Sequence, residues 1–293
     1  MSRLRALTAA VAATFVLVAC GSGNSTPDTT VPVVTHRIVS LSPTATEMLY
    51  AIGAGDQVVA VDSLSTYPAE VSDKVTKISA YEPSAEAILG YTPDVVLISN
   101  DMNKITEQLQ SVSSQKITVW TGAAAATLDD VYKQITELGA LTGHDKDAAT
   151  LIESMKSRIA KATENISAPM AAKSYFYELD NTLYSVTSNT FVGALLKPFG
   201  FTNIADGVEA GNDYPQLNAE VIAKANPSVV FLADTKCCAT NAADVAKRSG
   251  WAGIDAVKNG NIVELDDDVA SRWGPRVVDL VEQFAAAITA ANK

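Results

Sequence analysis

Two stretches of the chain are near copies of each other, and they decide the fold. Residues 84–98 read SAEAILGYTPDVVLI, and residues 218–232 read NAEVIAKANPSVVFL. In both, a polar residue suited to cap a helix stands two positions before a glutamate, and a proline follows that glutamate seven positions later, before an apolar run. Each copy therefore predicts a helix followed by a buried strand. The copies begin at positions 84 and 218, about one domain apart, so we expect two similar lobes.

The segments around the first copy alternate between strand and helix. Apolar runs typical of buried strands occupy residues 37–41, 58–61, 95–98 and 117–120. A helix is expected to begin at Ser42-Pro43 and to end at Gly53. Alternation of this kind predicts a parallel sheet covered by helices.

A long amphipathic helix is predicted between the two copies, over residues 145–165. Its apolar residues recur at spacings of three and four: Ala148, Ile152, Met155, Ile159, Ala162 and Ile166. Such a helix is roughly 30 Å long. We expect it to join the two lobes and to leave a cleft walled by strand ends and helix starts, where ligands bind in such sheets.

The amino terminus has the pattern of an export signal. Arg3 and Arg5 precede an apolar stretch, residues 6–19, that is too short to span a membrane. Residues 17–20, LVAC, resemble the lipobox of bacterial lipoproteins, which implies lipidation of Cys20; the alternative is an ordinary signal peptide that happens to precede a cysteine. The predicted organisation is a signal peptide over 1–19, a tether over 20–35, a first lobe over 36–144, a linking helix over 145–168 and a second lobe over 169–293.

Composition and charge limit the classes of partner. The chain is 47% hydrophobic, and its formal net charge of −11 argues against binding to nucleic acid or to anionic lipid headgroups. Besides Cys20, the cysteines are the adjacent pair Cys237 and Cys238. In an oxidising compartment this pair forms either a strained vicinal disulfide or two free thiols, and the sequence leaves both open.

Four features together resemble the cobalamin and iron-siderophore solute-binding proteins of ABC importers, over nearly all of residues 36–290. They are the opening RIVSLSPTATE at 37–47, the duplicated blocks, the linking helix, and LDDDVASRWGPR at 265–276. The resemblance implies an α/β fold of two Rossmann-like lobes with parallel sheets joined by a single long rigid helix, a class III solute-binding protein. It also implies a monomer without enzymatic activity, held at the bacterial cell membrane by lipid on Cys20, that delivers its ligand to a permease dimer and its ATPase.

In this family one glutamate on each lobe docks on the permease, and Glu86 and Glu220 match that motif. Their repetition suits a two-fold permease. The alternative is that each glutamate only complements its helix dipole, which contributes about 0.3 to 1 kcal/mol.

Ligand contacts are expected from aromatic and polar residues at the lobe edges. Tyr81 and Tyr214 precede the duplicated helices, and their flat faces suit a planar chelate, unless they are surface tyrosines packed on loops. The second group is Arg272, Trp273 and Arg276. Its guanidinium groups could pair with carboxylates or with an anionic iron chelate, although Arg276 could instead neutralise Asp266 to Asp268. Weaker candidates at strand ends are Ser42, Thr44 and Asn100.

The arginines favour a ferric siderophore or haem as the ligand. Cobalamin is the alternative, since both cleft aromatics are tyrosines where the cobalamin branch has tryptophan. We expect no cofactor, no catalytic residue and no metal site, and the run Asp266 to Asp268 lacks calcium-loop spacing and is expected to be solvated. A hydrolase is disfavoured because His36 and His144 lack a Gly-x-Ser-x-Gly elbow. An envelope protein in signalling or wall assembly, without transport, remains a further alternative.

Overall fold

The computed structural model describes residues 35–164 and 173–292. The predicted signal peptide, Cys20 and nearly all of the tether lie outside these residues, as does the boundary predicted between the linking helix and the second lobe. The predicted domain boundaries therefore remain predictions. Within the described ranges, no helix is long and apolar enough to cross a membrane.

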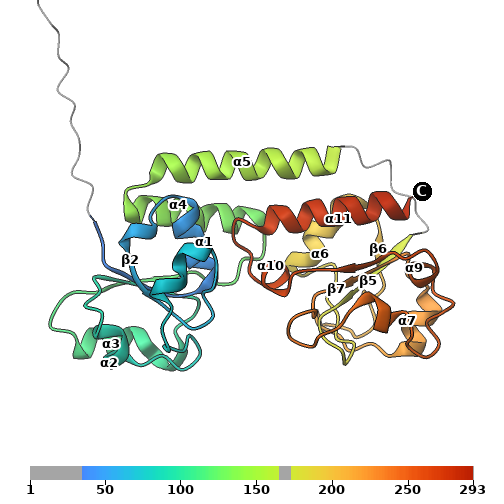
Figure 1. Cartoon of the computed structure of the whole chain (residues 1–293), viewed down its shortest axis with the longest axis horizontal. Helices are drawn as coiled ribbons and strands as arrows, with labels where there is room; N and C mark the ends of the chain where they lie inside the picture. The colour runs from blue at the N-terminus through green and yellow to red at the C-terminus, as the bar shows by residue number, and fades with distance from the viewer. Residues whose placement is uncertain (1–34, 165–172, 293) are drawn as a thin grey trace, which may run out of the picture. The chain divides into compact units, whose positions relative to one another are not determined.

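The first lobe is built on a four-stranded parallel sheet (Figure 1). Its strands lie in the order β2-β1-β3-β4, with β1 at Ile38–Leu41, β2 at Val58–Val61, β3 at Val95–Ile98 and β4 at Thr118–Thr121. Strands β1 and β3 are buried at every position, as their continuous apolar runs predict. All four predicted strands are confirmed to within one residue at either end.

The second lobe repeats this arrangement. Its parallel strands lie in the order β6-β5-β7-β8, with β5 at Ser174–Glu178, β6 at Thr202–Asn203, β7 at Val229–Leu232 and β8 at Ile262–Glu264. Strand β7 of the second copy therefore occupies the place that β3 of the first copy occupies. The two parallel sheets and their helices confirm the predicted α/β fold class.

The duplicated helices are α2, Ala85–Leu89, and α7, Ala219–Ala225. Ser84 caps α2 by accepting a hydrogen bond from the backbone N–H of Ala87 (3.3 Å), and Asn218 caps α7 through the N–H of Val221 (2.9 Å). Both caps confirm the sequence prediction.

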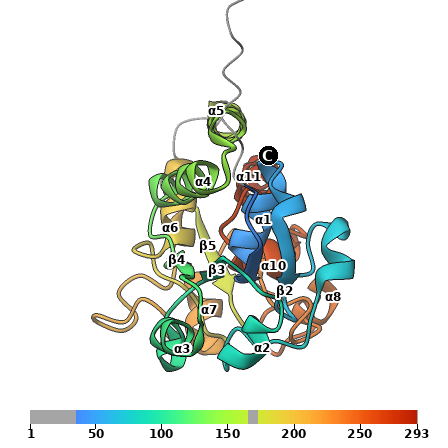
Figure 2. The ribbon, with the colours of Figure 1, turned by 90° about the vertical axis from the view of Figure 1, so that its left-hand side faces the viewer.

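Three longer helices pack together outside the sheets. The linking helix α5 spans Asp145–Glu164, and it contacts α4, Leu128–Thr142, from the first lobe and α11, Val277–Ala291, from the second. Figure 2 shows α5 above both of them. Its buried residues Ala148, Ile152 and Met155 belong to the predicted apolar face.

The remaining helices are short and mostly connect strands. They are α1 at Pro43–Ala51, α3 at Ile105–Val112, α6 at Phe191–Leu196, α8 at Ala242–Val245, α9 at Asp255–Lys258 and α10 at Asp267–Ser271. Helix α1 follows β1 after one residue, and α10 follows β8 after two residues. Both helices thus begin near the carboxyl ends of strands, where the candidate site lies.

Candidate functional site

A pocket of about 480 Å³ lies at the carboxyl ends of the first-lobe strands. It brings together four of the predicted ligand residues: Ser42, Thr44, Asn100 and Trp273. The rest of its lining is small or neutral: Ser99, Gly122, Ala123, Ala124, Ala125, Gln134 and Ser271. The pocket therefore offers hydroxyl and amide groups, one indole and no charged side chain, and its volume lies in the range usual for small-molecule sites.

Local structure positions the residues of this pocket. Ser42 is the N-cap of α1, and its hydroxyl accepts a hydrogen bond from the backbone N–H of Ala45 (3.2 Å). The indole of Trp273 stacks on Phe191 with ring centroids 4.4 Å apart. One face of the indole is thus covered by Phe191, and Trp273 also lines the pocket.

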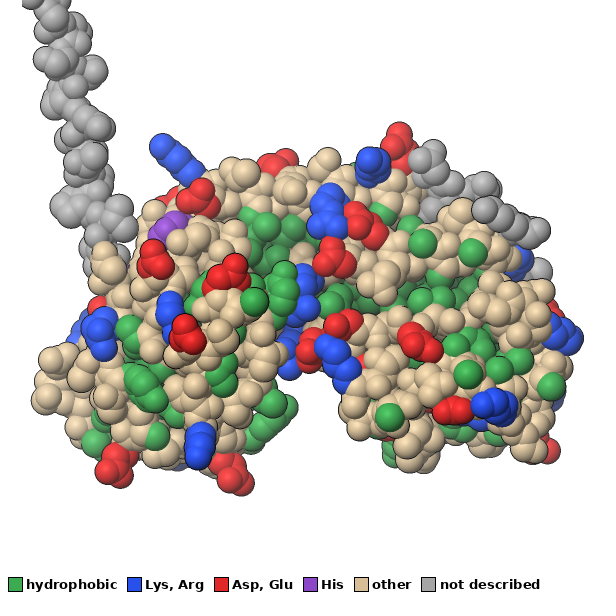
Figure 3. Space-filling view, in the orientation of Figure 1, with side chains coloured by type: hydrophobic (Ala, Val, Ile, Leu, Met, Phe, Trp, Pro, Cys, Tyr) green, Lys and Arg blue, Asp and Glu red, His purple; other side chains and the backbone are tan. Residues whose placement is uncertain are grey.

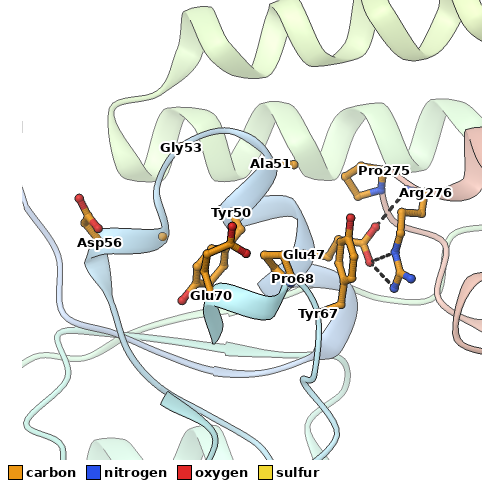
Figure 4. A pocket seen from close by; sticks show the side chains of 11 residues that line it. Glu47, Tyr50, Ala51, Gly53, Asp56, Tyr67, Pro68, Glu70, Pro275 and Arg276 are labelled. Atoms are coloured by element: carbon orange, nitrogen blue, oxygen red, sulfur yellow. Dashed lines mark hydrogen bonds and ion pairs between the residues drawn. The ribbon is translucent and has the colours of Figure 1, made fainter. Parts of the chain in front are cut away.

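The predicted ligand residue Arg276 is held by Glu47, a residue that sequence reasoning missed (Figure 4). Its guanidinium donates through Nε to Oε2 of Glu47 (2.8 Å), Nη2 lies 2.8 Å from the same oxygen, and its backbone N–H donates to Oε1 (3.0 Å). The guanidinium also lies over the ring of Tyr67, 3.8 Å from its centroid. Although burial opposes the charge, the hydrogen bond and charge of Glu47 raise the pKa of Arg276.

Glu47 is buried, and the pair joins helix α1 to the segment before α11, 229 residues away in sequence. Both residues line a second pocket of about 480 Å³, together with Tyr50, Tyr67, Asp56 and Glu70. The one available signal was that Glu47 is the single charged residue in the apolar helix 43–51. The alternative partners proposed for Arg276, Asp266 to Asp268, make no hydrogen bond or ion pair with it within the described residues.

Arg272 is also neutralised by a neighbour. It forms an ion pair with Asp268 (2.8 Å), and the side chains are 19% and 29% exposed. Lys236 bridges Asp266 (2.7 Å) and Asp268 (2.9 Å). The prediction that this acidic run is solvated is only partly right, because its residues are partly exposed and make defined contacts: Asp266 caps α10, and Asp267 holds the loop that carries Lys236.

Tyr81 and Tyr214 are both exposed, at 65% and 50%, just before α2 and α7. Neither is among the residues that line the two pockets. Their contact with a ligand therefore remains a prediction.

Glu86 and Glu220 lie in the first turns of α2 and α7, at equivalent positions of the two copies, and both are exposed. Within residues 35–164 and 173–292 neither carboxylate takes part in an ion pair. Figure 3 shows that acidic and basic side chains are scattered over the face it draws.

A buried charged cluster in the second lobe was not foreseen from the sequence. Both Nη atoms of Arg248 donate to the carboxylate of Glu178 (2.6 Å each), and the hydroxyl of Thr240 donates to Oδ2 of Asp234 (2.6 Å). Oδ1 of Asp234 is buried without a partner. Burial is the main cause that raises the pKa values of Glu178 and Asp234.

Cys237 and Cys238 lie in the loop that follows β7. Both are free thiols, and their Sγ atoms are 2.7 Å apart. Among the described residues there is no group of three or more histidine, cysteine, aspartate or glutamate side chains placed to hold a metal ion.

Comparison with known proteins agrees with this architecture. An ABC transporter substrate-binding lipoprotein of Bacillus subtilis, YvrC, is 34% identical over 269 residues, which cover 90% of this chain and 83% of that protein. A cobalamin-binding protein of Halobacterium salinarum is 32% identical and covers 86% of this chain and 69% of its own length. The haem-binding protein RhuT of Roseiflexus superposes with a TM-score of 0.72 at 25% identity, over 88% of this chain and all of RhuT.

The sequence model described as periplasmic binding protein matches residues 38–269, from the first strand of one lobe into α10 of the other. This match spans both sheets, the linking helix and the residues of the candidate pocket up to Val269. The chain therefore belongs to the periplasmic binding protein family.

Proposed function

We propose that the chain is an extracytoplasmic substrate-binding lipoprotein that captures a metal chelate and delivers it to an ABC importer, with no catalytic step of its own. The observation that carries this proposal is the uncharged pocket at the strand ends, lined by Ser42, Asn100 and Trp273, in a member of a solute-binding family. The relative named as an ABC transporter substrate-binding lipoprotein supports both the permease partner and the lipid anchor at Cys20.

Cobalamin is the ligand that we favour. The sequence argument for an anionic ferric siderophore or haem relied on Arg272 and Arg276, and each of these is already paired with a carboxylate. An anionic ligand would have to share these guanidinium groups with Asp268 or Glu47, whose negative charges oppose it. The corrin ring carries peripheral amides, which hydroxyl and amide side chains can bind without a counter-charge. A relative named as a cobalamin-binding protein supports the same choice.

Haem is the second candidate, and one observation favours it: the solved structure of RhuT, named as haem-binding, superposes on this chain. Ferric siderophores are the third candidate, because they too are metal chelates. The choice among these ligands is tested by binding.

The binding experiment uses calorimetric titration of the chain carrying Cys20→Ala, because these ligands absorb light and disturb fluorescence. The probes are cyanocobalamin, haemin, a ferric hydroxamate and a ferric catecholate. We expect saturable one-to-one binding of cyanocobalamin at micromolar or lower concentration, weakened at least about tenfold by Trp273→Ala, as for an aromatic hot spot. Tyr91→Ala, an exposed tyrosine outside the strand-end pocket, is the matched control and should bind normally. Binding of haemin alone would select the second candidate, and binding of none of the probes would contradict capture.

Delivery to a permease is tested separately by uptake. We propose that Glu86 and Glu220 dock on the two halves of the permease, because they are equivalent, exposed and without ion-pair partners in the described chain. Changing both to arginine should abolish uptake of labelled ligand by cells while leaving the calorimetric affinity unchanged. Glu107→Arg and Glu153→Arg, on exposed helix faces of the two helices α3 and α5, form the control pair. Normal uptake with the double docking variant would instead favour the envelope protein without transport.

A further inference from the structure

The loop between β7 and α8 presents two thiols side by side at the carboxyl end of a central strand. Cys237 is exposed and Cys238 is partly exposed, so a small reagent can reach both. Their Sγ atoms already touch, at 2.7 Å. The next residue, Ala239, has a positive φ of 54°, which is uncommon for a residue with a side chain.

We propose that Cys237 and Cys238 are a thiol-modification site, a vicinal dithiol that a small disulfide oxidant converts into a vicinal disulfide. The reaction balances as an exchange: one thiolate attacks the oxidant's disulfide and releases one thiol, and the second thiolate then attacks the mixed disulfide and releases the other. The two protein sulfurs are oxidised by two electrons, the oxidant is reduced, and the two thiol protons pass to the released thiols. Because the two cysteines are consecutive, no other part of the chain has to move to bring them together.

The loop is fastened to α10 through one carboxylate. Oδ2 of Asp267 accepts hydrogen bonds from the backbone N–H groups of Lys236 (2.9 Å) and Cys237 (2.8 Å), and Oδ1 accepts one from the hydroxyl of Thr235 (2.9 Å). Although burial acts in the opposite direction, these hydrogen bonds lower the pKa of Asp267. Asp267 is therefore the acceptor whose partners change when the loop closes into a disulfide ring.

The same carboxylate begins the helix that leads to the pocket. Asp267 is the first residue of α10, and Lys236 adds bonds to the flanking Asp266 and Asp268. Asp268 pairs with Arg272, next to the pocket residue Trp273. Vicinal disulfide rings need a distorted peptide geometry, because neighbouring Cα atoms are closer than a disulfide usually spans. Oxidation should therefore disturb the bonds to Asp267 and shift the wall that Trp273 forms.

A raised pKa of the Cys237 thiol limits the reactivity of the reduced form at neutral pH. Desolvation of its sulfur, the neighbouring Cys238 thiol and the nearby carboxylates raise the pKa of Cys237 to about 12. Cys237 is thus protonated at neutral pH, and thiols react as thiolates. The dithiol needs a specific oxidant or a raised pH to close, and the extracytoplasmic location in the proposed function would supply oxidising conditions.

The first experiment tests the modification without any ligand. The full chain carrying Cys20→Ser, which has only these two cysteines, is treated with oxidised glutathione at alkaline pH and examined by intact mass and thiol titration. We expect loss of two hydrogens and of both thiols, with no adduct. The matched variants Cys237→Ser and Cys238→Ser should each keep one glutathione. A persistent adduct on the two-cysteine chain, a disulfide-linked dimer, or thiols that react only after unfolding would overturn the proposal.

The second experiment tests the connection to the pocket. Hydrogen–deuterium exchange is compared between the reduced and oxidised chain. We expect several-fold faster exchange over residues 266–276 after oxidation and unchanged exchange over residues 84–98 in the other lobe. Unchanged exchange over 266–276 would refute the link through Asp267. A change in cobalamin affinity on oxidation rests on the proposed function, whereas the mass and exchange measurements do not, so the two failures are distinguishable.

Discussion

The two lobes share a strand order and a capped helix, but their buried polar groups differ. In the first lobe the hydroxyl of Thr46 contacts Ser40 (2.9 Å) and Ser65 (3.2 Å), and Ser65 donates to Asp62 (2.7 Å). The interior of the second lobe instead holds two carboxyl groups and one guanidinium, in Glu178, Asp234 and Arg248. Duplication thus preserved the backbone, which is fixed by apolar periodicity, while the polar interiors diverged.

The largest expected effect comes from disconnecting the lobes. Glu47→Ala removes the partner of a mostly buried guanidinium, and such a change usually costs about 3 to 5 kcal/mol of unfolding free energy. Urea unfolding followed by circular dichroism measures it. Glu282→Ala, which removes an exposed carboxylate near Arg158, is the control. A loss no larger than that of the control would mean that the lobes are joined by their apolar contacts alone.

A smaller effect, with a pH signature, is expected in the second lobe. Burial raises the pKa of Asp234, so the folded state prefers its protonated form, and stability is lost as the pH rises from the unfolded pKa through the raised folded value. Asp234→Asn removes this loss. We expect the stability of the variant relative to the parent to increase as the pH rises above the unfolded pKa, by about 1 to 3 kcal/mol, the usual cost of a buried polar group without a partner.

Thermal and urea unfolding at several pH values measure this difference. Asp62→Asn is the matched change in the first lobe, where the carboxylate accepts hydrogen bonds from Ser65 and from the backbone N–H of Leu64. Removing satisfied acceptors there should destabilise the chain. Parallel pH profiles for the two variants would show that the polar interiors do not differ in protonation.

Removing the helix cap of either duplicated helix should destabilise the chain by a similar amount. Ser84→Ala and Asn218→Ala each remove the side-chain acceptor of one duplicated helix, and each should cost about 1 kcal/mol. Urea midpoints of the two single variants and the double variant measure the costs and their additivity. A cost confined to one variant would show that the copies are equivalent in geometry but not in energy.

The smallest effect is expected at the surface between α5 and α11. Arg158 contacts Asp279 and Glu282 at 2.7 Å each, with all three side chains more than 40% exposed. Exposed pairs contribute about 0.2 to 1 kcal/mol each and are screened by salt. Arg158→Ala should therefore cost this little in dilute buffer and nothing measurable in molar salt. A salt-independent loss would contradict a purely electrostatic role.

Secondary-structure elements and helix caps that depend on residues close in sequence were predictable. The four first-lobe strands, the strand β7 of the second copy, the linking helix and the caps at Ser84 and Asn218 follow from periodicity and from residue types within a few positions. The strands β5, β6 and β8 were not predicted. The pairing of Glu47 with Arg276 was not predictable, because 229 residues separate them and the residues around either one do not indicate its partner. The pairing of Glu178 with Arg248 was not predictable either, because these residues are also far apart in sequence. For Arg276 the sequence suggested the nearby carboxylates Asp266 to Asp268 as partners, whereas the actual partner is the distant Glu47.

The close approach of α4 and α5 has a mechanical consequence. A Cβ atom at Gly139 of α4 would lie 2.6 Å from the Cβ of Ala148 in α5, so the two helices touch nearly backbone to backbone. Helices in such contact cannot slide or tilt against each other without a clash. We therefore expect a displacement of the second lobe to change the contacts between α5 and α11, including the exposed ion pairs of Arg158, more than the contact between α4 and α5. Helix α5 is thus fixed closely to α4 on one flank and is joined on the other flank to α11 by contacts that include exposed ion pairs.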